Sequence, residues 1–111
     1  DLKKSCFICA CPGRKIFLDR FAEAGKDPKD FGWRGIRTQD YTYVMELGYD
    51  VLPDAKRYLY HTKTDPEQRL PLDLTEKETR KLADDLESRV LKWMKKQKDG
   101  FANVWEKTIP V

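Results

Sequence analysis

The sequence predicts an α+β fold, in which a small antiparallel sheet of about four strands carries a long C-terminal helix and a shorter helix packed on one face. The apolar patterns along the chain read strand, helix, three strands and long helix. Residues 41–47 alternate between two faces, as in a half-buried strand, whereas the last third repeats its apolar residues with helical spacing. The 111 residues fit a single domain spanning the whole chain, 1–111.

The first predicted element is a short buried strand over residues 5–11, "SCFICAC", which "PGR" then ends. In a strand, Cys9 and Cys11 share one face and Cys6 takes the other, and we expect all three to be small apolar core residues. An odd number of cysteines so close together is not a disulfide framework. A metal site that combined them with His61 would lack the paired spacing that structural zinc sites prefer.

A short helix is predicted next, in "RKIFLDRFAEAG". Its apolar residues fall near helical spacing: Ile16, Phe17, Phe21 and Ala24. Gly25 stands where a helix would stop, and the charged "KDPKDFG" that follows predicts a loop.

Two strands are predicted in "GWRGIRTQDYTYV" and its continuation to Leu47. Trp33, Gly35 and Arg37 then share one face, opposite Arg34 and Ile36. After the loop "GYDVLPDAK", the run "RYLYHT" predicts a further strand, and "DPEQ" predicts the turn that ends it. That last strand places two tyrosines, Tyr58 and Tyr60, on the same face.

A long helix is the strongest prediction in the last third of the chain. Thr75 and Glu78 have the spacing of a capping box, and Gly100 is expected to end the helix. One apolar stripe runs along it: Leu82, Leu86, Val90, Trp93 and Met94. Acids gather early in the helix and lysines late, as the helix dipole prefers, so the lysines are interpreted as a solvated face. The tail "FANVWEKTIPV" is apolar enough to dock on the rest of the chain.

Composition and motifs exclude several classes of function. A net charge of +3, set against 22 basic and 19 acidic residues, does not by itself imply a polyanion partner. No signal peptide, transmembrane run, nucleophile elbow, P-loop, dinucleotide-binding pattern or metal triad occurs. The lone histidine, His61, is interpreted as a structural strand residue. Aromatic residues beside arginines are also found in single-strand nucleic-acid platforms, but here the aromatic alternation already serves a core face.

Two linked motifs carry a family resemblance. "GWRGIRTQDYTYV", then "YLYHTKTDPEQ", then a helix ending "LKWMKKQKDGF" resembles the C-terminal subdomain of the sulfatases, in the alkaline-phosphatase-like superfamily. The matching positions are Trp33, Arg34, Gly35, Ile36, Arg37, Thr38, Tyr41, Tyr43, Leu59, Tyr60, Asp65, Pro66 and Gln68. The resemblance covers about residues 31–101. After Asp-Pro the chain departs from the family pattern and reads "RLPLDL".

The resemblance implies a supporting role. The parent protein would hydrolyse a sulfate ester, expected on a carbohydrate, with a formylglycine nucleophile and calcium in an N-terminal catalytic domain that these residues lack. This subdomain would then contain no catalytic residue, metal site or cofactor of its own. The start "DLKKS", without Met, suggests a processed or excised piece of that parent, which is expected to be periplasmic or secreted.

Partners follow from the same resemblance. The expected partner is the parent's catalytic domain, with no nucleic acid and no membrane, and a dimer through the exposed interdomain face is a further expectation. A free-standing binding module for nucleic acid or a protein partner stays open as the alternative.

The segment "ACPGR" at 10–14 is similar to the sulfatase nucleophile motif, Cys/Ser-x-Pro-x-Arg, but it does not fit the chemistry. Ala10 occupies the position that must be oxidised, and Cys11 stands one place too late. A carbon without sulfur or hydroxyl cannot become that nucleophile. The segment is therefore interpreted as the exit from a strand and the start of a helix.

The arginines in the hairpin are expected to have structural and surface roles. We hypothesise that Arg37 crosses the sheet to Asp65, because a guanidinium binds a carboxylate and nearby carbonyls together. Arg34 is then expected to face solvent or the missing catalytic domain. Trp33 and Tyr60 are assigned to the structural set with Arg37 and Asp65.

Contacts with an anionic substrate are expected only at the edge of this subdomain. Arg14 and Arg20 are candidates for such contacts. By the resemblance, the loops at 12–15, 26–31 and 48–56 would lie at the rim of a substrate cleft.

Overall fold

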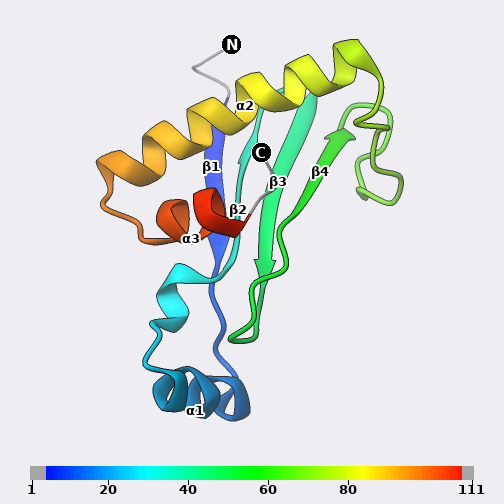
Figure 1. The fold of residues 1–111 in the computed structure, drawn as a ribbon. Helices are drawn as coiled ribbons and strands as arrows, with labels where there is room; N and C mark the ends of the chain where they lie inside the picture. The colour runs from blue at the N-terminus through cyan, green and yellow to red at the C-terminus, as the bar shows by residue number, and fades with distance from the viewer. Residues whose placement is uncertain (1–4, 109–111) are drawn as a thin grey trace.

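The computed structural model describes residues 5–108 and contains one four-stranded sheet with three α-helices (Figure 1). The elements are β1 (Cys6–Ala10), α1 (Lys15–Ala24), the 3-10 turn η2 (Pro28–Asp30), β2 (Gly32–Arg37), β3 (Tyr41–Gly48), β4 (Lys56–His61), α2 (Lys77–Lys96) and α3 (Phe101–Thr108). The predicted α+β class is confirmed. No helix among the described residues is both long and apolar enough to cross a membrane.

The sheet is an antiparallel meander in the order β1-β2-β3-β4. Its register aligns Phe7 with Ile36, Ile36 with Tyr43, and Tyr43 with Leu59, so these side chains form one row on one face. The β2–β3 turn is closed by Thr38, whose backbone amide and hydroxyl both donate to the carbonyl of Tyr41, at 2.7 and 3.1 Å. Consecutive pairing leaves β1 and β4 as the two edge strands.

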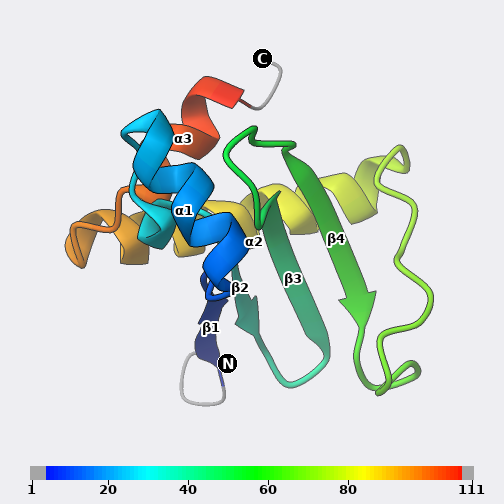
Figure 2. The same cartoon turned by 90° about the horizontal axis from the view of Figure 1, so that it is seen from below.

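The core lies between the sheet and α2, which crosses one face of the sheet (Figures 1 and 2). The predicted helical stripe supplies Leu86, Val90 and Met94, all buried. The sheet supplies a second set of fully buried side chains: Ile36, Tyr43, Met45, Leu47 and Leu59. For residues 101–108 the expectation that the tail docks is met by α3, whose Phe101 and Trp105 are buried in the same core; residues 109–111 lie outside the described range.

The first helix follows the sequence prediction closely. It ends at Ala24, and Gly25 adopts the left-handed conformation (φ 67°) that residues with a Cβ rarely reach. The amides of Gly25 and Lys26 donate to carbonyls of the last turn. Phe21 on this helix is fully buried and contacts Phe31, with ring centroids 4.8 Å apart. The "ACPGR" segment is indeed the end of β1 and the entry to α1.

Both predicted ends of the long helix were wrong in detail. The helix begins at Lys77 without a side-chain cap, because Thr75 instead donates its amide and hydroxyl to Asp73, at 2.9 and 2.6 Å. These hydrogen bonds hold the pKa of Asp73 below its usual value. At the other end the chain leaves the helix through Lys98 (φ 58°), and the amide of Asp99 donates back to Met94.

Gly100 therefore has a different role from ending α2. A Cβ at this position would lie 2.3 Å from Oδ1 of Asp30, so the glycine allows the η2 segment to approach the start of α3. The close approach joins two segments that are about 70 residues apart in the sequence.

The prediction that the three cysteines belong to a buried strand was also wrong. Cys6, Cys9 and Cys11 are free and exposed, and no residue of β1 is fully buried. The physical reason is cover: β1 is an edge strand to which no residue of the buried core belongs, whereas the other edge strand, β4, contributes the fully buried Leu59.

Candidate functional site

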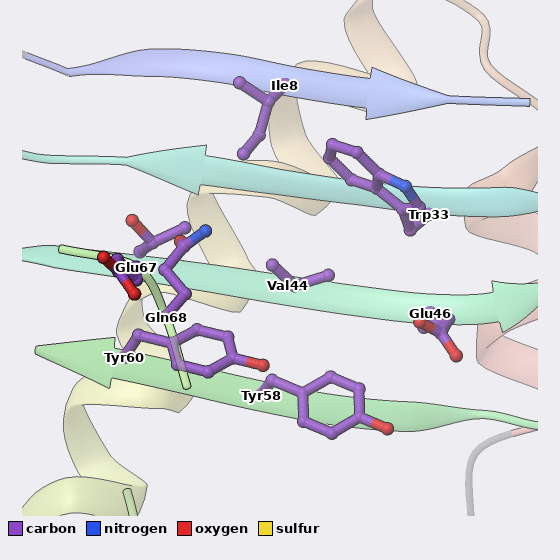
Figure 3. Close-up of a pocket in the computed structure, with 9 residues that line it drawn as sticks. Ile8, Trp33, Val44, Glu46, Tyr58, Tyr60, Glu67 and Gln68 are labelled. Atoms are coloured by element: carbon purple, nitrogen blue, oxygen red, sulfur yellow. The ribbon is translucent and has the colours of Figure 1, made fainter. Parts of the chain in front are cut away.

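The candidate site is the face of the sheet that α2 does not cover. Five apolar or aromatic side chains line it, all only half-buried: Ile8, Trp33, Val44, Tyr58 and Tyr60 (Figure 3). Together with Thr42, Glu46, Glu67 and Gln68 they line a hollow of about 470 Å³. We call this hollow the open face. Its size falls within the range of small-ligand and side-chain pockets.

Strand alternation and one glycine create the open face. Ile8, Gly35, Val44 and Tyr58 follow one another across the four strands, so their side-chain positions share a face. A Cβ on Gly35 would lie 2.5 Å from the carbonyl oxygen of Tyr43 and 3.3 Å from Cγ1 of Ile8. Because Gly35 has no side chain, the centre of the open face is hollow, and the larger side chains around it form the walls.

The turn after β4 forms one wall of the open face, and it carries two unusual features. Gln68 has a positive φ of 55°, which is rare for a residue with a side chain. Its Oε1 atom is buried and has no hydrogen-bond partner among the described residues. In Figure 3, Glu67 and Gln68 lie beside Tyr60, over β3 and β4. An unpaired acceptor at the edge of an apolar hollow is where a partner's N–H or O–H group would gain most.

The predicted contact between Arg37 and Asp65 does not form. The carboxylate of Asp65 instead accepts the amides of Leu70 and Arg69, at 2.9 and 3.1 Å, and these bonds lower its pKa. Arg37 is exposed at the end of β2 and makes no ion pair within the described residues. The turn satisfies the aspartate locally, so a long-range cation is not needed.

The buried arginine of the hairpin is Arg34, which the sequence analysis placed toward solvent or a missing domain. Its side chain is 3% exposed, and it binds Asp99 through Nε–Oδ2 at 2.6 Å and Nη2–Oδ1 at 3.2 Å. Its guanidinium also donates to four backbone carbonyls, those of Ala10, Lys29, Phe31 and Trp33. The planar fork thus binds a carboxylate and carbonyls together, as proposed for Arg37, but on the opposite face.

Arg34 ties distant parts of the chain to one point. Asp99, 65 residues away, lies just after α2, and the guanidinium carbon lies 4.6 Å from the ring centre of Phe101 at the start of α3. Burial by itself would lower the pKa of Arg34, but the hydrogen bond and charge of Asp99 raise it. The residue remains charged and enclosed, so it holds the fold together and does not contact a ligand.

A second polar network lies beneath α2 near β4. The hydroxyl of Tyr43 donates to Glu87 and accepts from Nε of Arg57, both at 2.9 Å, and Arg57 also binds Asp84 at 2.7 Å. Burial, followed by the charge of Glu87, raises the pKa of Tyr43 well above its usual value. The tyrosine therefore stays protonated and is not a candidate general base. Through Arg57, Asp84 fastens α2 to the sheet.

The candidate anion contacts Arg14 and Arg20 lie in and near α1, away from the open face. Arg20 donates to Asp50 at 2.8 Å, and Lys26 donates to the carbonyl of Val51. These bonds hold α1 against the loop between β3 and β4 (Figure 1). Arg14 lies beside an apolar hollow shared with Phe17 and Tyr49.

The three predicted rim loops, 12–15, 26–31 and 48–56, therefore gather at one end of the molecule. Exposed apolar side chains in this region include Ile16, Tyr49 and Leu52. Arg20 is committed to Asp50, which leaves Arg14 as the arginine at this end whose side chain has no hydrogen-bond partner within the described residues.

The residues expected to carry no chemistry are placed as follows. His61 contacts Thr64 through Nδ1 at 2.8 Å and lies against the ring of Tyr41. Within residues 5–108, no group of three or more His, Cys, Asp and Glu is arranged to hold a metal ion. Ala10 stands where a formylglycine would be needed, so these residues do not fit that group.

Trp33 and Tyr60, assigned a structural role from the sequence, both line the open face. Burial, followed by the nearby Tyr58 and Glu46, raises the pKa of Tyr60. The open face is thus lined mainly by apolar and aromatic side chains, with Glu46 and Glu67 at its edges. The apolar content of the open face was visible in the sequence alternation, but its aromatic residues were predicted to belong to the core.

Comparison with known proteins adds no relative. The chain matches no protein-family model, and no curated protein matches it significantly.

Proposed function

We propose that this chain is a non-catalytic supporting subdomain of a sulfatase-type enzyme, and that it packs the open face of its sheet against a catalytic domain. One observation carries the proposal: an apolar, aromatic sheet face of otherwise ordinary core composition has no covering layer among residues 5–108. Two-layer α+β units cover one face with helices, and an uncovered apolar face marks an interaction surface.

The sulfatase assignment rests on the motif resemblance, and the order of the elements supports it. Both motifs lie on the sheet and its last turn, with the long helix following them in the chain. In this proposal calcium and formylglycine belong to the catalytic domain, which acts on sulfated carbohydrates. The parent enzyme is then periplasmic or secreted, and these residues contribute no group to the reaction.

The direct test is the reading frame that encodes these residues. We expect several hundred codons upstream of Asp1, including a Cys/Ser-x-Pro-x-Arg motif. We also expect that the enzyme from that frame hydrolyses an aryl sulfate, whereas the chain of 111 residues does not. A frame that encodes little besides these residues, or sulfate-ester turnover by the chain alone, would contradict the proposal.

The second candidate is a free-standing binding module for a protein partner, which the same open face favours. A short reading frame would select this candidate, and the partner would then cover Trp33 and Tyr58. A dimer could also cover the open face, and sedimentation of the purified chain measures whether such a dimer forms. Nucleic acid is less favoured, because Glu46 and Glu67 flank the aromatic side chains and would repel phosphates.

A further inference from the structure

A second hollow lies on the opposite side of the sheet from the open face, where α2 crosses β1 (Figure 1). It has a volume of about 420 Å³, and its lining residues are Ser5, Phe7, Arg89, Lys92, Trp93 and Lys96. We call it the basic hollow. The ring of Phe7 stacks on Trp93 with centroids 4.6 Å apart and planes inclined by 1°. Phe7 is 38% exposed, so an aromatic surface remains open to solvent.

Three cations surround this aromatic pair. Arg89, Lys92 and Lys96 follow one stripe of α2 at helical spacing, over roughly 10 Å of helix axis. Arg89 is fixed by donating from Nη2 to Ser5 Oγ at 3.0 Å. Lys92 and Lys96 are exposed and make no ion pair within residues 5–108, whereas the neighbouring Lys95 binds Glu106 at 3.1 Å. On this stripe of the helix the preceding carboxylate is Asp85, one turn before Arg89; Glu87 is closer in sequence but contacts Tyr43 and Arg57.

We propose that the basic hollow binds a segment of a sulfated polysaccharide, with a sugar ring against the Phe7–Trp93 pair and sulfate groups on Arg89, Lys92 and Lys96. Aromatic side chains bind the C–H faces of pyranose rings, and Lys and Arg bind sulfate oxygens through charge-assisted hydrogen bonds. The choice of a sulfated sugar among polyanions rests on the proposed function. The site would hold the polymer away from the catalytic domain.

Two other polyanions fit the basic hollow less well. Single-stranded nucleic acid binds along successive separate aromatic platforms, whereas Phe7 and Trp93 stack on each other and present one surface. An anionic membrane requires a broad apolar helix face that inserts, but Leu86, Val90 and Met94 of α2 are already buried in the core.

The test is titration of the purified chain with a heparin-derived sulfated oligosaccharide. Binding is monitored by the NMR chemical shifts of the backbone amides and of the tryptophan indole N–H groups. We expect shifts confined to Phe7, Trp93 and residues 89–96, and affinity that falls with added salt. The double variant Lys92→Gln/Lys96→Gln should lower affinity about tenfold, because it removes two cations from the hollow. The matched variant Lys77→Gln/Lys81→Gln removes the same charge from the far end of α2 and should change affinity less than about twofold.

Each arm of the experiment can overturn the proposal. Equal loss in both double variants would show that net charge, not the hollow, drives binding. Binding of the desulfated oligosaccharide or of polyuridylate as strongly as the sulfated one would contradict a sulfated-sugar site. If residues of the basic hollow show no NMR shift change, the proposed site is also contradicted, whatever the reading frame encodes. If the hollow binds the sulfated oligosaccharide but the reading frame lacks the nucleophile motif, this site stands and only the proposed function fails.

Discussion

On the face of the sheet that α2 covers, Ile36, Tyr43 and Leu59 are fully buried, whereas on the open face Trp33 and Tyr58 remain half-exposed. The two faces come from the same strands and have similar apolar content. They differ in exposure and in how their polar side chains are paired. In the core under the covered face, Arg34 and Tyr43 each have several hydrogen-bond partners, although Nε1 of Trp105 has none among the described residues. Beside the open face, the buried Oε1 of Gln68 has none.

This difference separates stability from interaction. The covered face is buried and its arginine and tyrosine are paired, so changes there should lower the free energy of unfolding. The open face retains apolar area and an unpaired acceptor, so changes there should affect association more than folding. Matched substitutions on the two faces test this division directly.

The largest effect is expected from Arg34→Met, with Arg37→Met as its matched control on the same strand. Loss of Arg34 removes the guanidinium from Asp99 and from four carbonyls, leaving Asp99 only the amide of Phe101, and we expect the free energy of unfolding to fall by about 3–5 kcal/mol. Arg37 is exposed and unpaired within the described residues, so its loss should cost less than about 0.5 kcal/mol. Urea unfolding followed by circular dichroism measures both, and similar losses would refute the division.

The double variant Arg34→Met/Asp99→Leu sharpens this test. If the penalty comes from an uncompensated charge, removing Asp99 as well should restore part of the lost stability. A double variant that is less stable than Arg34→Met would instead assign the loss to packing around the guanidinium and Phe101.

A smaller effect is expected from Tyr43→Phe, compared with Tyr58→Phe on the open face. The hydroxyl of Tyr43 links Glu87 to Arg57, so removing it should lower the free energy of unfolding by about 1–2 kcal/mol. Tyr58→Phe removes a hydroxyl from a half-exposed ring and should leave the urea midpoint nearly unchanged. An equal shift of the midpoint in both variants would mean that the open face is also internally constrained.

The open face is tested by Trp33→Ser and Tyr58→Ser. In the chain alone we expect each to cost less than about 1 kcal/mol, because neither side chain is fully buried. In the protein from the complete reading frame, the same changes should lower the thermal unfolding temperature or the recovery of folded enzyme. Unchanged behaviour of that protein would show that the open face has no covering partner.

The smallest effect concerns pH and Asp30. Burial, followed by the charges of Asp27 and Asp99, raises the pKa of Asp30 above its unfolded value of 3.8. Its ionisation therefore opposes folding: the penalty is absent below pH 3.8, grows as pH rises from 3.8 to the folded pKa, and is constant above the folded pKa. Asp30→Asn should raise the thermal midpoint slightly at pH 7 and leave it unchanged at pH 3. A stabilisation that persists at pH 3 would assign the gain to packing beside Gly100.

Much of the fold was predictable because periodicity is a local property. Alternation at Tyr41–Leu47, helical spacing from Leu82 to Met94, and Gly25 as a stop each depend on neighbours in the chain. The predictions that failed depend on what lies across space. Gly100 leaves room for the carboxylate of Asp30, the cysteines are exposed because β1 lies outside the core, and Asp65 is satisfied by its own turn.

The sequence by itself determined that Arg34 and Arg37 lie on opposite faces of the hairpin, because side chains alternate along any strand. Only the tertiary structure decided which face is covered. Both faces carry apolar side chains, so alternation alone cannot distinguish the core from an interaction surface. The choice comes from α2 and α3, which bring Asp99 and Phe101 to Arg34 across 65 or more residues. The free energy that compensates the burial of Arg34 comes from contacts between distant segments, and such contacts leave no local pattern in the chain.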